Sequence, residues 1–264
     1  MTDVHIRKAT PTPRSKPAPK TTKIAVPFTY SPSDDGTDEN LLIILHGLGD
    51  THVPFSRMAK NLKLPQTATL TLRAPELIPF LYEDAYQWYP SFDGLGQPIE
   101  RPNPTKALDL LSNVLEHLQT ECNWSPRKIH LFGFGQGGTV AVELCIRWWK
   151  AQMTSQNPLP LASIVSISGP LLSYPTLSTK CPTPLLIVQR PSSEDFAISS
   201  SAITDLNKGY QTVIEQKLSN PNGGMPASKA EWEPIMRFWS EKLNRRQADG
   251  LYEVMSGIAT PNSK

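Results

Sequence analysis

Two hydrophobic patterns alternate along the middle of this chain. Continuous apolar runs such as LLIIL at 41–45 are typical of strands buried on both faces of a sheet, and segments with apolar residues at helical spacing lie between them. The predicted strands are residues 23–30, 41–47, 67–75, 128–134, 161–169, 184–191 and 210–218, and the predicted helices are residues 55–63, 104–121, 136–150, 199–207 and 228–243. This alternation predicts one α/β domain with a mostly parallel central sheet and helices on both faces.

The two ends of the chain lack this pattern. Residues 1–22 are rich in Pro, Lys, Thr and Ser, and six of the 26 basic residues fall within the first 23 positions. We expect a disordered, basic, Pro-rich tail over 1–22, a folded domain over 23–244 and a C-terminal extension over 245–264. Because the whole chain has a net charge of only +2, the folded part lacks a basic footprint, and we expect no nucleic-acid partner.

The cysteines and the apolar runs limit the cellular compartment. Cys122, Cys145 and Cys181 are far apart in the sequence and form no C-x-x-C pair, so neither a disulfide framework nor a zinc site is indicated. No apolar run is long enough to span a bilayer, and the N-terminus lacks the apolar core of a secretory signal. We expect a reduced compartment, the cytoplasm or the nucleus, and no membrane span, metal or cofactor.

The stretch LFGFGQGG at 131–138 has two interpretations, of which the first is a dinucleotide-binding turn. The pattern G-x-G-x-x-G is met by Gly133, Gly135 and Gly138. A dinucleotide site wants this turn in the first strand-helix-strand unit and an acidic residue about 20 positions later to hold the ribose. Here several strands precede the glycines, and no Asp or Glu lies between Glu143 and Glu194. This interpretation is therefore disfavoured.

The second interpretation is the strand-to-helix elbow of hydrolases, G-x-S-x-G. Gly133 and Gly137 take the flanking positions, Gly138 follows them, and Gly135 stands where the pattern has serine. The elbow also needs a loop after an earlier strand that stabilises an oxyanion, and LHGLGD at 45–50 lies where that loop is expected. We therefore favour the elbow.

Five motifs occur along residues 23–244 in the order of one known family: LHGLGDT, LRAPE, QWYPSFD, GFGQGGTVAVEL and SISGPLL. With these motifs the chain resembles the acyl-protein thioesterase, or phospholipase/carboxylesterase, group of α/β-hydrolases. The resemblance implies the α/β-hydrolase fold and a functional site at the elbow. It also implies that the backbone N–H groups of Leu48 and Gln136 are the oxyanion donors.

The three catalytic positions that the resemblance implies all depart from the family pattern. Gly135 takes the place of the serine nucleophile. The aspartate position falls on Ser193, with Asp195 two residues later as a candidate substitute acid. The histidine position, in a segment before the last helix, falls on Ala227. The triad is therefore degenerate by resemblance.

The histidines give a reason that does not depend on this correspondence. In the α/β-hydrolase fold the catalytic histidine follows the nucleophile and the acid along the chain. The histidines of this chain are His5, His46, His52, His117 and His130. None follows residue 130, so a triad in the order Ser, Asp, His cannot be built, and we expect no catalytic residues.

Four residues are candidates to shape a pocket near the elbow: His46, Trp88, Tyr89 and Ser168. The aromatic segment 80–92 either forms a recognition surface or packs over the edge of the sheet, and the sequence leaves both alternatives open. We expect His46 to hold its loop through a backbone hydrogen bond, and His130 to be a buried core residue.

Three hypotheses for the function follow. The first is an inactive α/β-hydrolase that binds a protein partner or an acyl-type small molecule. The second is an active carboxylesterase or thioesterase with a non-standard site, for example a water activated by Asp195. The third is a structural subunit that uses its basic tail as the contact. The first is favoured, because no acyl-enzyme forms without a nucleophile and a neighbouring base.

Overall fold

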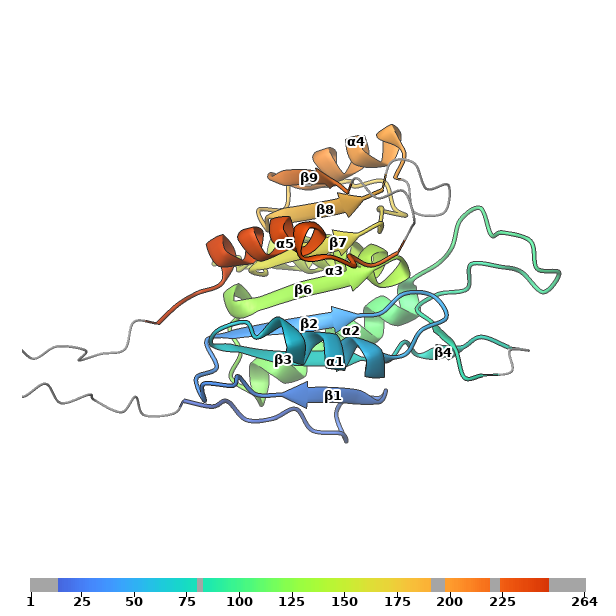
Figure 1. The fold of residues 1–264 in the computed structure, drawn as a ribbon. Coiled ribbons are helices and arrows are strands. Elements are labelled where there is room, and N and C mark those ends of the chain that lie inside the picture. The colour runs from blue at the N-terminus through green and yellow to red at the C-terminus, as the bar shows by residue number, and fades with distance from the viewer. Residues whose placement is uncertain (1–13, 80–82, 191–197, 219–223, 247–264) are drawn as a thin grey trace, which may run out of the picture.

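A single seven-stranded sheet forms the centre of the computed structural model, which describes residues 14–79, 83–190, 198–218 and 224–246 (Figure 1). In order across the sheet, the strands are β1 (Phe28–Ser31), β3 (Thr67–Leu72), β2 (Asn40–Leu45), β6 (Ile129–Phe134), β7 (Ser163–Ile167), β8 (Leu185–Gln189) and β9 (Val213–Lys217). Only β1 runs antiparallel to its neighbour. The predicted mostly parallel sheet is therefore confirmed.

Because β2, β3 and β6 to β9 are parallel, their carboxyl ends share one edge of the sheet, on the right in Figure 1. The loops that follow β2, β6, β7 and β8 all begin at this edge. The elbow and the loop at 45–50 are thus brought to the same end of the molecule, where ligands bind in open α/β sheets.

Helices cover both faces of the sheet, as predicted (Figure 1). They are α1 (His52–Leu62), α2 (Thr105–Thr120), α3 (Gln136–Gln152), α4 (Ser200–Gly209) and α5 (Lys229–Lys242). The first and last, α1 and α5, pack in one hydrophobic cluster, and α2, α3 and α4 pack in the other. In the described part of the chain, no helix is both long enough and apolar enough to cross a membrane.

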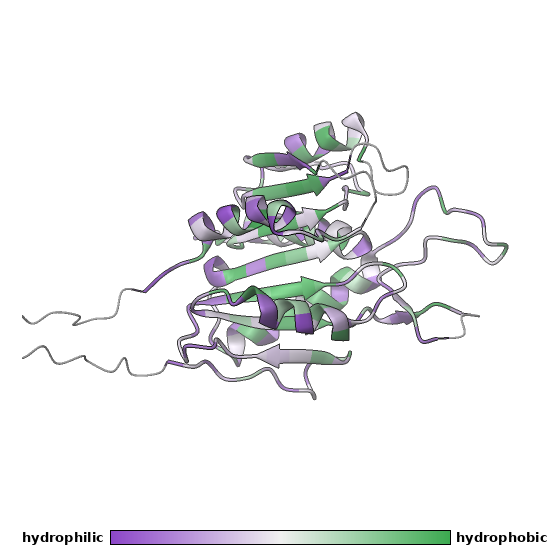
Figure 2. Cartoon of the chain, viewed as in Figure 1, coloured by the Kyte–Doolittle hydropathy of each residue, from purple (hydrophilic) through white to green (hydrophobic). Residues whose placement is uncertain are grey.

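Strand β2 shows why the apolar runs are continuous. Leu41, Ile43 and Leu45 belong to the cluster under α2 and α3, whereas Leu42 and Ile44 belong to the cluster under α1 and α5. Successive side chains of a strand point to opposite faces, so a strand covered on both sides needs an apolar residue at every position. In Figure 2, β2 and β8 are largely green, whereas α1 and α5, which lie in front of the sheet, carry purple bands.

The predicted disorder of residues 1–22 is wrong for residues 14–22, which pack on the end of α2. The backbone N–H of Lys20 donates to His117 Nε2 at 3.1 Å, and Lys20 Nζ lies 2.8 Å from a carboxylate oxygen of Glu121. Composition alone suggested a tail with nothing to bury, but the side chain of Lys20 finds an acidic partner on the domain. The first thirteen residues lie outside the described part of the chain.

Two further details differ from the predictions. The first strand begins at Phe28 rather than at residue 23, because Pro27 has no N–H to donate to a ladder. A small antiparallel pair, β4 (Glu76–Leu77) and β5 (Tyr86–Gln87), has no counterpart among the predicted strands. Of the predicted C-terminal extension, only the first two residues are described.

Candidate functional site

The elbow between β6 and α3 turns at Gly135. Its φ of +51° and ψ of −118° lie in a region that residues with a side chain rarely adopt, and a Cβ built there meets nothing within 4 Å. The Gly135 N–H donates to the carbonyl oxygen of Ile167 at 2.8 Å, and its carbonyl accepts from Thr139 at 3.0 Å. The backbone geometry of the elbow is thus retained, but the residue at its tip has no side chain.

The three glycines around the tip allow close packing, as predicted. A Cβ at Gly133 would lie 2.3 Å from the carbonyl oxygen of Gly137, and one at Gly137 would lie 2.3 Å from that of Leu45. A Cβ at Gly138 would lie 2.5 Å from Ser166 Oγ. Only glycine lets the start of α3 approach β2, β6 and β7 this closely.

The Gly135→Ser variant is expected to lower the free energy of unfolding by about 1–3 kcal/mol, because serine takes on the strained φ that glycine adopts readily. The added side chain enters open space and causes no clash. Thermal denaturation checks this, with Gly94→Ser as control: Gly94 also has open space around it, and its φ is not in the left-handed region. A higher melting temperature for Gly135→Ser would contradict this explanation.

The two predicted oxyanion donors come from the start of α3 and from the loop after β2, which share the carboxyl edge of the sheet. Gln136 is the first residue of α3, so its N–H has no acceptor within the helix. Leu48 lies in the loop after β2, which is held by a 3.0 Å hydrogen bond from Gly49 N–H to the carbonyl of Tyr86. Within the described residues, neither the Leu48 nor the Gln136 N–H has an acceptor. Both remain available to an oxygen atom of a ligand.

His46 holds the start of the loop and is not a base. Its Nε2 accepts from the Ala74 N–H at 2.9 Å, which puts the proton on Nδ1, and Nδ1–H donates to the Gly47 carbonyl at 2.7 Å. Burial lowers the pKa of His46 to about 4. The ring is therefore neutral near pH 7, with both nitrogens occupied by backbone groups.

The neutral His46 predicts a loss of stability in mild acid. Its pKa of about 4 in the folded protein lies below the ordinary histidine value of 6.5, so only the unfolded chain takes up this proton as the pH falls from 6.5 to 4. The free energy of unfolding is expected to fall over that interval by about 1.4 kcal/mol per pH unit for this group. Urea denaturation at several pH values measures the slope, and His46→Asn should make it shallower; an unchanged slope would contradict the assignment.

The side chain of Gln136 ties the elbow to the aromatic segment, a contact that the sequence analysis missed. Its Oε1 accepts from the Trp88 N–H at 2.9 Å, and its Nε2 donates to the carbonyl of Tyr89 at 2.9 Å and to Ser91 Oγ at 2.7 Å. The indole N–H of Trp88 donates to the His46 carbonyl at 2.8 Å. One network therefore joins α3, the segment around residue 88 and the loop after β2.

This network corrects the role predicted for three of the pocket candidates. His46 and Trp88 are fully buried and Tyr89 is 6% exposed, so they support the site from behind rather than facing an opening. Of the two alternatives for segment 80–92, packing holds for Trp88 and Tyr89, whereas Phe92 is 53% exposed. Residues 80–82 lie outside the described part of the chain.

Ser168 is the pocket candidate that the structure places next to the elbow. It follows Ile167, which pairs with Phe134 at the end of β6, and it is half-buried. Its φ of +55° is unusual for a residue with a side chain, and its N–H donates to the Val188 carbonyl at 2.9 Å. His130 is too distant to activate it, because that side chain is buried at the other end of β6 and bonded to Ser163 Oγ at 2.7 Å.

A buried ion pair lies beside the two segments in which the resemblance predicts the acid and the histidine. Arg190, directly after β8, contacts Glu231 on α5 through two hydrogen bonds of 2.8 and 3.0 Å. Arg190 also donates to the carbonyls of Gly224 and Met225. The Arg190 guanidinium beside Glu231 lowers the pKa of that carboxyl to about 2. Sequence analysis missed this pair, because nothing local links residues 41 positions apart.

The remaining catalytic positions have no catalytic group in the described structure. Ala227 is exposed, and its backbone N–H donates to Glu231 Oε2 at 2.8 Å, so it is held by the same ion pair. Ser193 and its candidate substitute Asp195 lie outside the described residues.

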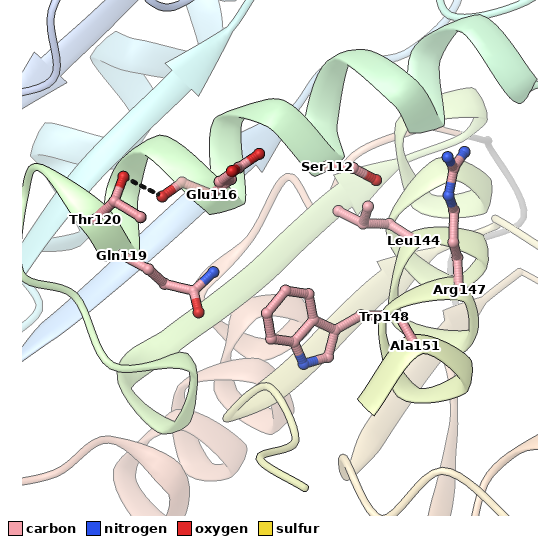
Figure 3. A pocket seen from close by; sticks show the side chains of 8 residues that line it. All are labelled: Ser112, Glu116, Gln119, Thr120, Leu144, Arg147, Trp148 and Ala151. Atoms are coloured by element: carbon pink, nitrogen blue, oxygen red, sulfur yellow. Dashed lines mark hydrogen bonds between the residues drawn. The ribbon is translucent and has the colours of Figure 1, made fainter. Parts of the chain in front are cut away.

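A separate hollow of about 450 Å³ lies between α2 and α3 (Figure 3). The half-buried indole of Trp148 points into it from α3, opposite Glu116 and Gln119 of α2, while the neighbouring Trp149 is buried. Arg147, also in its lining, lies 12 residues beyond Gly135, about 18 Å along the helix. The hollow is therefore not part of the elbow site.

Comparisons with known proteins agree with this geometry. The model of the phospholipase/carboxylesterase family matches residues 28–244. An uncharacterized hydrolase of Mycosarcoma maydis is 40% identical over 222 residues, which cover 83% of this chain and 82% of that protein. An uncharacterized hydrolase of Schizosaccharomyces pombe is 36% identical over 120 residues, 43% of this chain and 49% of that protein.

Solved structures of esterases and thioesterases share the fold. The esterase PE8 superposes with a TM-score of 0.66 at 20% identity, over 83% of this chain and 99% of that one. The acyl-protein thioesterase 2 of Zea mays superposes with a TM-score of 0.65 at 18% identity, over 83% of this chain and the whole of that one.

Proposed function

This chain belongs to the phospholipase/carboxylesterase family of α/β-hydrolases, and on that premise we propose that it binds an acyl-type ligand or a protein partner at the remnant of the hydrolase site instead of cleaving an ester or thioester. The observation that carries the proposal is Gly135. The tip of the elbow, at φ +51°, carries no oxygen or sulfur that could attack a carbonyl carbon.

The chemistry of acyl transfer explains why this one position matters. A serine nucleophile needs a hydroxyl at the tip and a histidine base within hydrogen-bond distance of it. Here the hydroxyl is missing, no histidine follows residue 130 in the sequence, and His46 has both ring nitrogens occupied. The family's chemical step therefore has neither its nucleophile nor its base.

Binding needs less than catalysis, and its elements remain. The N–H groups of Leu48 and Gln136 are unoccupied among the described residues, and the start of α3 adds a positive field that favours an oxygen with negative charge. Among the described residues, no atom lies within 4 Å of a Cβ built at Gly135. An acyl carbonyl or carboxylate fits these donors, and exposed apolar side chains such as Leu48 and Phe92 suit an acyl chain or an apolar partner surface. We further propose a reducing compartment, the cytoplasm or nucleus, in keeping with three free cysteines.

Steady-state hydrolysis of short acyl esters and thioesters tests the proposal, together with calorimetric titration of a medium-chain fatty acid. We expect turnover no greater than the remnant of about 10³–10⁴ over water that survives loss of the triad, and saturable binding of the fatty acid or, from cell extract, a reproducible protein partner. Turnover at the level of an active family member that persists on repurification and disappears in Asp195→Asn would instead establish the second hypothesis, a non-standard esterase.

Truncation distinguishes the third hypothesis, contact through the basic tail, from binding at the elbow. Deleting residues 1–13 leaves the packed residues 14–22 in place, so the fold is preserved. Under the proposal, ligand or partner binding survives this deletion. Binding that is lost with the tail would favour the structural-subunit hypothesis.

A further inference from the structure

Two cysteines that the elbow site does not use lie in contact with each other in the core. The sulfur atoms of Cys145 and Cys181 are 3.9 Å apart, and both side chains are fully buried. Cys145 lies in the middle of α3, and Cys181 lies four residues before β8. The pair therefore bridges two elements that are 36 residues apart in sequence.

Backbone hydrogen bonds hold the main chain at both cysteines, while the side chains can still rotate. Cys181 N–H donates to the Gly209 carbonyl at 2.8 Å, and the Cys181 carbonyl accepts from Gln211 at 2.9 Å. Cys145 is held by the hydrogen bonds of a 17-residue helix. The third cysteine differs: Cys122 has its sulfur 3.7 Å from His117 Nε2, and no cysteine partner is found among the described residues.

We infer that Cys145 and Cys181 form a reversible modification site, a disulfide that joins α3 to the segment entering β8 when the protein meets a two-electron oxidant such as hydrogen peroxide. The sulfurs must approach from 3.9 Å to the disulfide length of about 2.05 Å. A shift of this size is within the reach of side-chain rotation and a small movement of the segment before β8.

The reaction balances with one peroxide. The Cys181 thiolate attacks a peroxide oxygen, which forms a sulfenic acid and releases one water or hydroxide. The Cys145 sulfur then attacks the sulfenic sulfur, the S–S bond forms, and the second oxygen leaves as water with the thiol proton. The two sulfurs lose two electrons, the peroxide gains them, and a dithiol reductant restores the two thiols.

The environment assigns different roles to the two sulfurs. The hydrogen bond from the Cys145 thiol lowers the pKa of Cys181, whereas burial raises the pKa of Cys145. Cys181 is thus the sulfur that reacts first. Because both are fully buried, the oxidant arrives only when the surrounding segment opens, and the reaction is slower than at an exposed thiol.

The test treats the folded full-length protein with hydrogen peroxide, blocks the remaining thiols by alkylation and maps tryptic peptides by mass spectrometry. Each cysteine falls in its own peptide, with Cys122 in 107–127, Cys145 in 129–147 and Cys181 in 181–208. The expected product is a disulfide between peptides 129–147 and 181–208. Its mass is two hydrogens less than the sum of the two peptide masses, and dithiothreitol separates them. Closing this loop should raise the melting temperature by about 5–10 °C.

Three variants separate the outcomes. Cys122→Ala should keep both the cross-link and the rise in melting temperature, whereas Cys145→Ala and Cys181→Ala should lose both. Peroxide treatment of the chain in guanidinium shows that the dose is sufficient to oxidise its thiols. The inference is overturned if that dose leaves the folded protein without this cross-link, if the product contains Cys122, or if it joins two chains. None of these results depends on whether the elbow binds a ligand.

Discussion

The Gly137→Ala variant is expected to lose at least about 4 kcal/mol of stability, enough to leave little folded protein. A Cβ at this position would lie 2.3 Å from the Leu45 carbonyl oxygen and 2.5 Å from the His46 carbonyl oxygen. Both atoms belong to the backbone of β2 and its loop, so no side chain can rotate away. To avoid this clash, the start of α3 would have to move away from β2 and its loop. Far-UV circular dichroism and urea denaturation measure the loss.

Two other glycines supply matched controls for this prediction. Gly94→Ala adds the same methyl group in open space, and we expect almost no change in stability. Gly135→Ala, also in open space but at φ +51°, isolates backbone strain and should fall between the two. A Gly137→Ala protein as stable as Gly94→Ala would mean that α3 does not approach β2 this closely.

Neutralising Glu231 is the second change with a large expected effect. Glu231→Gln removes the charged partner that contacts the buried Arg190 guanidinium at 2.8 Å, and removing one partner of a buried ion pair costs about 3–5 kcal/mol. The same carboxylate also accepts from the Ala227 N–H, so the segment before α5 should loosen as well. Chemical denaturation at pH 7 measures the cost, and hydrogen exchange at residues 224–227 reports the loosening.

Glu233→Gln is the matched control on the same helix. Glu233 pairs with Arg237 at 3.4 Å, but both side chains are 63% exposed, and we expect a change below about 1 kcal/mol. The pH dependence adds a second check. The pKa of Glu231 is about 2 in the folded protein, below the ordinary glutamate value of 4.5. The ion pair therefore contributes its full stability above pH 4.5, and this contribution is lost as the pH falls towards 2. Equal losses for the two variants at pH 7 would contradict the importance of the buried pair.

Local sequence patterns were sufficient for the parts of this molecule that depend on neighbours in the chain. The apolar runs predicted the buried strands, and the glycines around residue 135 predicted the elbow, because both features arise from steric limits within a few residues. The missed features are contacts between distant segments. Gln136 reaches Trp88 and Tyr89, Arg190 reaches Glu231, and Lys20 reaches the end of α2. No periodicity records which distant partner a polar side chain will find.

At the candidate site, the backbone resembles that of the family, whereas the side chains differ from the family pattern. Backbone features of the hydrolase elbow are retained, including the positive φ at the tip and the N–H groups of Leu48 and Gln136, for which the described residues provide no acceptor. Under our proposal, the side chains that would perform acyl transfer are replaced at Gly135 and Ala227, the positions that the resemblance implies for the serine and the histidine. The backbone features determine fold and family, whereas the catalytic side chains determine activity. Membership of a hydrolase family therefore does not by itself make this chain a hydrolase.

Intact-protein mass spectrometry after incubation with a fluorophosphonate probe and with an activated acyl ester tests the central claim most directly. If the elbow carries no nucleophile, the mass stays that of the unmodified chain, while an active family esterase treated in parallel gains one adduct. A stoichiometric adduct mapped to a side chain beside the elbow, accompanied by hydrolysis at a matching rate, would contradict it.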